Sequence, residues 1–239
     1  MKLPIERAVA LGVAAAVAAG LLFALPAMDA GQAMAQAREK TVQLPAAQGA
    51  ASFQDDRPLA SVVFAGGCFW GVQGVFQHVK GVRSAVSGYI GGDAASAHYA
   101  QVSSGRTAHA EAVQVQYDPR QVSYGQLLQV FFSVAHDPTQ RDRQGPDHGR
   151  QYRSAVFADD PRQQQATRAY IGQIQPLFPS PVVTELGSGQ RFYRAERYHQ
   201  DYMRLNPQAA YIRYYDAPKL AALQRQFPQL YRAQPVRTP

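Results

Sequence analysis

The stretch SVVFAGGCFWG, residues 61–71, contains Cys68, the only cysteine of this 239-residue chain. The apolar run before the glycines is typical of a buried strand, and the glycines and aromatic residues after it predict a turn into a helix. Unpaired backbone N–H groups and the helix dipole at such a helix start lower the pKa of a thiol. The pattern therefore predicts a nucleophilic thiolate at Cys68, although a lone cysteine without this context is usually a buried structural residue.

Short strands and amphipathic helices alternate along the rest of the chain. The expected strands span 61–65, 112–117, 152–157 and 181–186. The expected helices span 124–134, 160–177 and 219–227, the second of them opening with a proline in its first turn. Beyond Pro207 we expect mainly a surface wrap. This order favours a single α+β domain built as an open two-layer sandwich.

The N-terminal segment has the composition of an export signal. Lys2 and Arg7 precede an uncharged apolar stretch at 8–27, and Ala33-Met34-Ala35 has the small residues that a signal peptidase accepts. The apolar stretch is also long enough for an uncleaved membrane anchor. The expected organisation is a signal peptide or anchor at 1–35, a flexible linker at 36–58 and a catalytic domain at 59–239. We expect a periplasmic protein.

The formal net charge of +7 comes mainly from arginines spread along the chain. They form no dense run and no nucleic-acid motif, so we interpret the charge as a property of the solvated surface. With one cysteine the chain forms no internal disulfide, which is informative for a protein expected in an oxidising compartment.

Three further motifs follow GCFWG at 67–71: GYIGG at 88–92, GRTAHAEAV at 105–113 and DHGRQYRS at 147–154. With these four motifs in order, the chain resembles the peptide methionine sulfoxide reductases of the A type from about residue 61 to about residue 231. The resemblance implies reduction of the S epimer of methionine sulfoxide, free or in proteins. It also implies a ferredoxin-like core within the two-layer sandwich.

Sulfoxide reduction needs a soft nucleophile for the sulfur and an acid that protonates the oxygen. Cys68 is the only candidate nucleophile, and the resemblance assigns the acid to Glu111. A carboxyl in a partly apolar pocket has a raised pKa and keeps its proton at neutral pH. The alternative for Glu111 is an ordinary surface residue of an edge strand.

The resemblance also implies that Tyr99 and Tyr152 donate hydrogen bonds to the sulfoxide oxygen. Asp147 matches a family carboxylate near the sulfur, and we interpret it as ordering Tyr152 or a pocket water. A plain turn residue is the alternative for Asp147. Phe69 and Trp70 would form an apolar cage for the methyl group of the substrate. The methyl group requires apolar surroundings and the S–O group requires polar ones, so a pocket with one wall of each kind selects one epimer.

The histidines show no metal-ligand spacing, and we expect structural or exposed roles for them rather than a metal site. The residues concerned are His109, His136, His148 and His199. No cofactor is expected.

The chain departs from the family pattern at Ser103, where some members carry cysteine, and in 211–239, which lacks the resolving cysteines of many members. A sulfenic acid on Cys68 therefore needs an external thiol, such as a thioredoxin-like protein, for its reduction. We expect a monomer with oxidised proteins as substrates. Two alternatives are a Cys–His hydrolase or acyltransferase and a non-catalytic module that binds methionine-rich segments.

Overall fold

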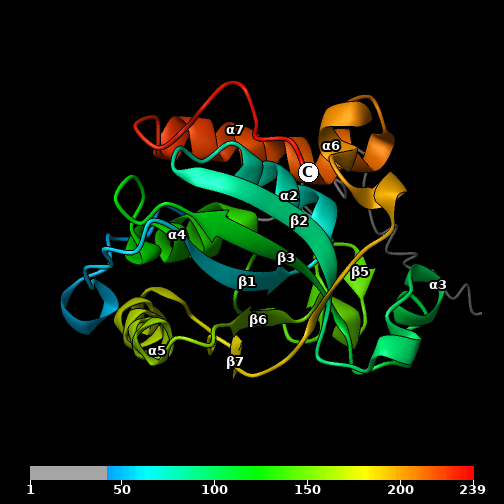
Figure 1. Ribbon diagram of the computed structural model, residues 1–239, viewed down its shortest axis with the longest axis horizontal. Coiled ribbons are helices and arrows are strands. Elements are labelled where there is room, and N and C mark those ends of the chain that lie inside the picture. The colour runs from blue at the N-terminus through cyan, green and yellow to red at the C-terminus, as the bar shows by residue number, and fades with distance from the viewer. Residues whose placement is uncertain (1–41) are drawn as a thin grey trace, which may run out of the picture.

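The computed structural model describes residues 42–239 (Figure 1). Six strands form one sheet in the order β7-β6-β1-β3-β2-β8. They are β1 (Ala60–Gly66), β2 (Val82–Ile90), β3 (Ala110–Tyr117), β6 (Ser154–Phe157), β7 (Glu185–Gly187) and β8 (Phe192–Arg194). A separate small hairpin pairs β4 (Arg143–Gln144) with β5 (Asp147–His148).

Within residues 42–239, six α-helices and several shorter helical turns connect these strands. The α-helices are α2 (Phe69–Gln77), α3 (Tyr99–Val102), α4 (Tyr124–Val130), α5 (Pro161–Ile174), α6 (Tyr202–Leu205) and α7 (Ala217–Gln226). The shorter turns are η1 (Gly49–Ala51), η2 (Ala94–Ser96), η3 (Phe131–Ala135), η4 (Arg150–Tyr152), η5 (Gln175–Leu177), η6 (Arg197–His199) and η7 (Ile212–Asp216).

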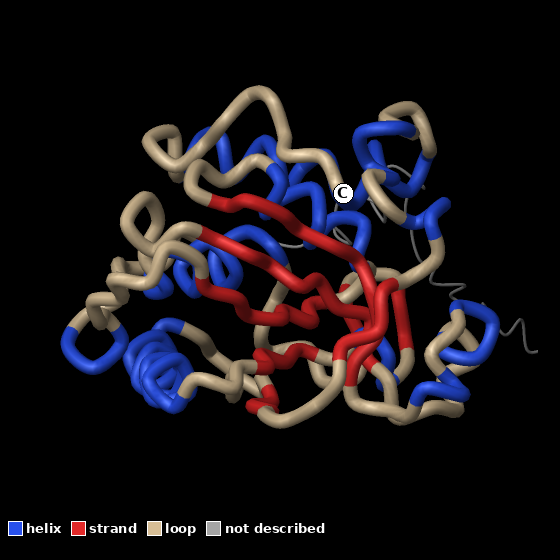
Figure 2. The backbone as a smooth tube through the Cα atoms, viewed as in Figure 1, coloured by secondary structure: helices blue, strands red, loops and turns tan. Residues whose placement is uncertain are grey.

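The core of the molecule is the unit β1-α2-β2-β3-α4-β6. Its strands lie in the order β6-β1-β3-β2 and are antiparallel to their neighbours, which is the ferredoxin-like arrangement. Strand β7 adds to one edge in parallel and β8 to the other edge in antiparallel orientation. Figure 2 shows the strands as one curled sheet, with α2 and α4 behind it in the view of Figure 1. The predicted α+β sandwich with a ferredoxin-like core is confirmed.

Successive side chains along the central strands point to opposite faces of the sheet, and only every second one faces the helices. In β1, Val62 and Phe64 belong to the main core under the helices, whereas Val63 and Ala65 belong to a small cluster on the other face. In β3 the odd positions, such as Val113, belong to the main core. Because side chains two residues apart share a face, Glu111 points to the helix side, toward the start of α2.

Most of the expected elements are present with shifted ends. Strand β6 begins at Ser154, because η4 occupies the positions just before it. The helix expected at 124–134 is α4 continued by the π-turn η3, and α4 begins with a capping box between Ser123 and Gln126. Strands β2 and β8 were not predicted, since glycines interrupt or flank their apolar patterns.

The predicted flexible linker at 36–58 is wrong for its described part, 42–58. Leu44 is only 2% exposed, and its backbone N–H donates to the Ser133 hydroxyl at 3.1 Å. The carbonyl of Pro45 accepts a hydrogen bond from the Tyr170 hydroxyl at 2.8 Å. These contacts attach the segment to η3 and α5. The signal peptide and the first part of the linker lie outside the described residues.

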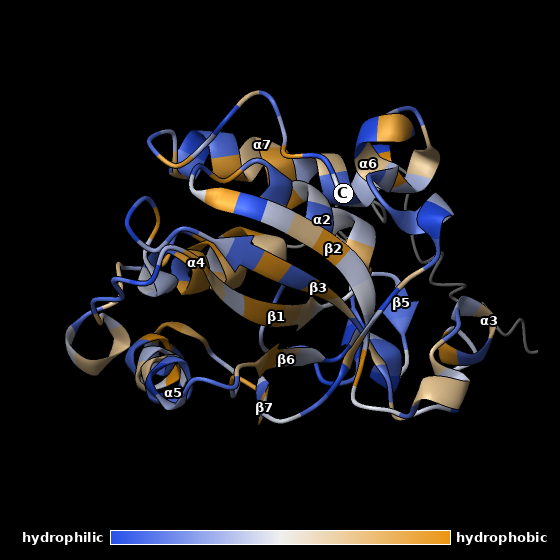
Figure 3. Cartoon of the chain, in the orientation of Figure 1, coloured by the Kyte–Doolittle hydropathy of each residue, from blue (hydrophilic) through white to orange (hydrophobic). Residues whose placement is uncertain are grey.

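The predicted surface wrap after Pro207 is also wrong in part. Ile212, Leu223 and Phe227 are buried, and the latter two belong to the main core. Figure 3 shows hydrophilic and hydrophobic residues alternating along α7, as expected for a helix with one packed face. The C-terminal segment therefore completes the core rather than only covering it. Among residues 42–239, no helix combines the length and apolarity needed to cross a bilayer.

Candidate active site

Cys68 lies at the junction of β1 and α2, in the position just before the first helical residue. The turn depends on Gly67, whose φ of +88° favours glycine. A Cβ at Gly67 would also lie 2.5 Å from the Cβ of Gln144 in the β4 strand. The two constraints explain why the strand reaches the cysteine through glycine, and they confirm the predicted strand-to-helix turn.

The prediction of a lowered thiol pKa is wrong for the resting protein. Cys68 is 8% exposed, and burial raises the pKa of its thiol well above the ordinary value. The acidic side chains of Glu111, Asp216 and Asp147 raise it further as they ionise, whereas the backbone N–H of Trp70 at the helix start acts in the opposite direction. The helix N-terminus is present, but burial and negative charge outweigh it, so the resting group is the neutral thiol.

Glu111 is a buried carboxyl beside the start of α2. Its side chain is 2% exposed, and burial, the largest cause, raises its pKa to about 8. The Phe69 backbone N–H donates to Glu111 Oε2 at 3.1 Å and partly offsets this rise. The carboxyl of Glu111 is therefore mostly protonated at neutral pH and is attached to the residue next to Cys68.

Tyr99 and Tyr152 lie on two different connections that meet beside the thiol. Tyr99 begins α3 and Tyr152 ends η4, and both side chains are partly exposed. Burial raises the pKa of both hydroxyls, and Glu111 and Cys68, once ionised, raise it further. Both hydroxyls therefore remain protonated and able to donate within the field of the two candidate catalytic groups.

Asp147 lies on β5 in the same electrostatic neighbourhood, where its charge raises the pKa of Glu111, Cys68 and Tyr152. The structure shows a different partner from the expected one. Among residues 42–239, no hydrogen bond joins Asp147 to Tyr152; instead the hydroxyl of Tyr211 donates to Asp147 Oδ2. The interpretation of Asp147 as ordering Tyr152 is not supported by this geometry.

Phe69 and Trp70 form two sides of an aromatic cluster. Trp70 stacks on Tyr202 with ring centroids 3.8 Å apart and an interplanar angle of 12°. Its indole N–H donates to Nδ1 of His199 at 3.1 Å, and the ring of Phe69 lies 5.0 Å from the same imidazole. The two predicted cage residues are thus held by contacts from the C-terminal segment, which fix the indole plane.

Sequence reasoning missed His199, which was expected to be structural or exposed. It is buried, and it lies 4.4 Å from the Tyr99 ring as well as against Phe69 and Trp70. Burial lowers its pKa, although Glu196 opposes this, so the imidazole is neutral. Because Nδ1 accepts from the indole, the hydrogen bonding assigns the proton to Nε2. Only the aromatic and polar composition of the stretch YHQDY at 198–202 signals this contribution.

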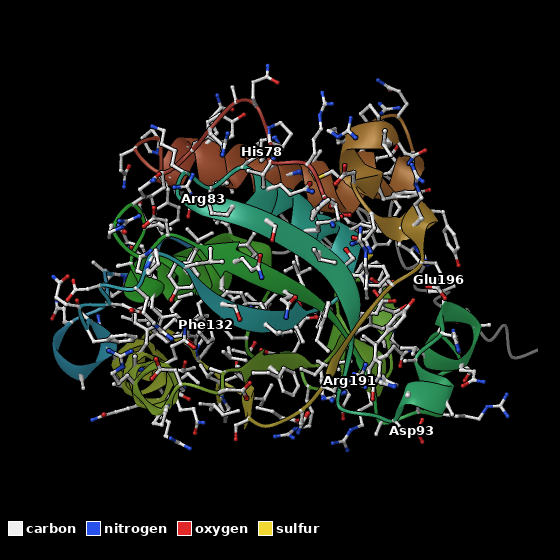
Figure 4. All side chains as sticks on the ribbon, viewed as in Figure 1. His78, Arg83, Asp93, Phe132, Arg191 and Glu196 are labelled. Carbon is white, nitrogen blue, oxygen red and sulfur yellow. The ribbon has the colours of Figure 1, made fainter. Side chains whose placement is uncertain are left out.

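Glu196 is a second residue that the sequence did not single out. Its carboxylate accepts the Tyr89 hydroxyl at 2.8 Å and the Tyr99 backbone N–H at 2.9 Å. Figure 4 shows Glu196 on the segment that leads from β8 toward α6, beside α3. One side chain therefore attaches the α3 connection to the sheet.

Asp216 and Lys219 form a buried ion pair beneath the start of α2, with Nζ 3.6 Å from Oδ1. A Cβ at Gly71 would lie 2.1 Å from Asp216 Oδ1, so α2 and the carboxylate are in close contact. The charge of Asp216 contributes to the raised pKa of both Cys68 and Glu111.

The remaining histidines lie apart from this chemistry. The buried imidazole of His136 is hydrogen-bonded to the Phe131 carbonyl and the Ser154 hydroxyl, and it stacks on the Phe131 ring. Within the described range, no histidine hydrogen-bonds to Cys68, so the Cys–His hydrolase alternative gains no support. In the same range, no three His, Cys, Asp or Glu side chains gather as a metal site.

Comparison with known proteins agrees with this arrangement. The family model described as peptide methionine sulfoxide reductase matches residues 60–231. The chain belongs to this family. It is 57% identical over 178 residues to peptide methionine sulfoxide reductase MsrA 2 of Mesorhizobium japonicum, covering 74% of this chain and 91% of that protein. It is 49% identical over 180 residues to the Synechocystis protein of the same name, covering 74% and 84%.

A solved structure supports the fold as well. Methionine sulfoxide reductase A of Corynebacterium diphtheriae superposes with a TM-score of 0.55 at 30% identity, covering 72% of this chain and 89% of that one. The chain is therefore a methionine sulfoxide reductase of the A type, an oxidoreductase that acts on sulfur. The non-catalytic binding module is not supported.

Proposed function

We propose that the chain reduces the S epimer of methionine sulfoxide in exported proteins, with Cys68 as nucleophile and Glu111 as acid. One observation carries this assignment: a buried carboxyl with a pKa of about 8 accepts the backbone N–H of the residue next to the thiol. A proton donor and a soft nucleophile thus lie at one helix start, as sulfoxide reduction requires.

The step balances with these two groups. The Cys68 sulfur attacks the sulfoxide sulfur while Glu111 gives its proton to the sulfoxide oxygen. The S–O bond of the substrate breaks, an S–O bond to Cys68 forms, and the thiol proton returns to Glu111. The products are methionine and the sulfenic acid of Cys68, so the substrate sulfur gains the two electrons that the cysteine loses. The raised pKa of both groups means that both protons are in the resting site.

Recognition of one epimer would follow from a polar wall and an apolar wall on two sides of the substrate sulfur. The hydroxyls of Tyr99 and Tyr152 remain protonated and would donate to the oxygen as its negative charge develops. Phe69 and Trp70 would enclose the methyl group, because an apolar group gains from aromatic contact and a polar one loses. The opposite epimer would direct its oxygen into the aromatic wall.

Reduction of the sulfenic acid must use a thiol from outside the chain, because Cys68 is its only cysteine. An external thiol would attack the sulfenic sulfur and release water, and a second thiol would break the mixed disulfide and restore Cys68. A thioredoxin-like dithiol and a small monothiol both have this chemistry, and we propose the former as the partner.

The N-terminal sequence supports a place of action outside the inner membrane. A charged start, an apolar core and Ala33-Met34-Ala35 follow one another in export order. We expect a mature N-terminus at Gln36 in an osmotic-shock fraction. Recovery of the full-length chain only in membranes would make the protein an anchored enzyme instead.

The direct test is turnover of a methionine sulfoxide peptide that contains both epimers, with a dithiol as reductant and mass spectrometry as the readout. We expect complete loss of the S epimer and retention of the R epimer. Equal loss of both epimers would refute the proposed walls of the site. Hydrolysis of an ester or amide without loss of sulfoxide would refute the reductase assignment.

A further inference from the structure

Tyr211 contacts both Asp147, which lies 64 residues earlier in the sequence, and Trp70. Its hydroxyl donates to Asp147 Oδ2 on β5, and its ring lies edge-on to Trp70 with centroids 5.9 Å apart. The ring of Tyr215 also packs against the Tyr211 ring, with centroids 5.1 Å apart. The side chain therefore contacts both the carboxylate beside the thiol and the indole that forms the apolar wall.

The surroundings of Asp147 explain why such a donor matters. Burial raises the pKa of Asp147, and the Tyr211 hydroxyl, Lys219 and His148 all act in the opposite direction. A buried carboxylate is costly without a hydrogen-bond donor, and it then rotates toward one or takes up a proton. The Tyr211 hydroxyl makes a direct hydrogen bond to the Asp147 carboxylate.

We propose that Tyr211 is a positioning residue of the reductase step, whose hydroxyl holds the Asp147 carboxylate in place and whose ring fixes the edge of Trp70. The proposal rests on the proposed function, because it assumes that Cys68 and Glu111 do the chemistry beside Asp147. On this proposal, the C-terminal segment, which lacks resolving cysteines, positions groups that take part in the reaction.

The effect reaches the reacting groups through charge. The Asp147 carboxylate raises the pKa of Glu111, Cys68 and Tyr152, and so helps to keep their protons in place. Tyr211 in turn keeps Asp147 ionised and pointing into the site. Without the hydroxyl, we expect Asp147 to take up a proton at higher pH, and its charge is then lost over a range where the parent enzyme retains it.

The test is the first-order rate of methionine formation in a single turnover without reductant, a rate constant that does not depend on how much enzyme is folded. Tyr211→Phe keeps the ring and removes the hydroxyl. We expect it to slow the step by about 10- to 100-fold at pH 7, as the loss of a hydrogen bond to a charged group predicts. Affinity for the sulfoxide should change by less than about threefold, because the ring against Trp70 remains.

A double-mutant cycle separates positioning from a general structural effect. In an Asp147→Asn background, Tyr211→Phe should change the rate by less than about threefold. In the Asp147 background, it should slow the step by about 10- to 100-fold with little change in the affinity for the sulfoxide. Tyr214→Phe is the matched control, because Tyr214 lies in the same segment and is 49% exposed, and we expect parent rates from it.

An equal slowing by Tyr211→Phe in both backgrounds, or an unchanged rate in the Asp147 background, would overturn the proposal. Failure of the proposed function looks different. In that case, the parent enzyme forms no methionine in the single turnover, or Cys68→Ser forms as much as the parent.

Discussion

The β1–α2 junction and the segment from Glu196 to Asp216 contribute to the same site by different means. The junction and its partner strand provide the thiol and the acid, Cys68 and Glu111, from the ferredoxin-like core. The C-terminal segment provides no reacting atom in our account. Its side chains position neighbouring residues of the site. Glu196 accepts a hydrogen bond from the Tyr99 backbone N–H, and the Tyr211 hydroxyl donates to Asp147.

On the proposed assignment, chemistry and positioning come from separate parts of the chain. Groups on central strands and at a helix start are rigid because the core surrounds them, as precise catalysis requires. Hydrogen bonds with the C-terminal segment hold Tyr99 and Asp147 on their connections. Changes in the core should therefore remove the reaction, and changes in the segment should weaken it.

The largest effect is expected from Cys68→Ser. A serine hydroxyl stays neutral at physiological pH and is a harder, poorer partner for sulfur, so turnover should fall below about one hundredth of the parent. Methionine formation from a sulfoxide peptide with a dithiol measures this, and a thermal melt checks that the variant folds. Activity above that level would require another nucleophile.

Glu111→Gln should slow the single-turnover step by roughly 10² to 10⁴, the usual contribution of a positioned acid. The amide keeps an acceptor for the Phe69 N–H but has no proton to give. In the parent, the rate should fall as pH rises through about 8, because the protonated form of Glu111 is the donor. The variant should lack that limb, and an unchanged rate at pH 8 would remove Glu111 from the mechanism.

Gly71→Ala tests the close contact between the two regions. The new Cβ would lie 2.1 Å from Asp216 Oδ1, so α2 and η7 must move apart. We expect a loss of about 1–3 kcal/mol in the free energy of unfolding, measured by urea denaturation. Gly172→Ala in α5 is the control, because its Cβ meets nothing within 4 Å, and it should be neutral or stabilising. Equal effects of the two changes would contradict the contact.

The smallest effect is expected from Glu196→Gln, which keeps the shape of the side chain and removes its charge. The hydrogen bonds from Tyr89 and Tyr99 weaken without disappearing, so we expect about a tenfold loss of single-turnover rate or less. Glu185→Gln on the edge strand β7 is a control and should leave the rate unchanged. A loss as large as that of Glu111→Gln would mean that the segment takes part in the chemistry itself.

The same contrast separates the features that the sequence predicts from those that depend on contacts between distant parts of the chain. Local patterns predicted β1, the turn at Cys68 and α5, because alternation and turn residues act over a few positions. The raised pKa of Cys68 and the partner of Asp147 were not predictable. Both depend on burial and on carboxylates or hydroxyls that the fold brings in from Glu111, Asp216 and Tyr211. No local pattern encodes such contacts across 64 residues of sequence.

The central claim is that Cys68 alone receives the sulfoxide oxygen and awaits an external thiol. It is tested most directly by the mass of the enzyme after reaction with excess sulfoxide and no reductant. We predict one methionine per enzyme and a gain of about one oxygen, trapped by a dimedone-type probe, as sulfenic acid chemistry requires. A loss of two hydrogens, or more than one methionine per enzyme, would contradict the account.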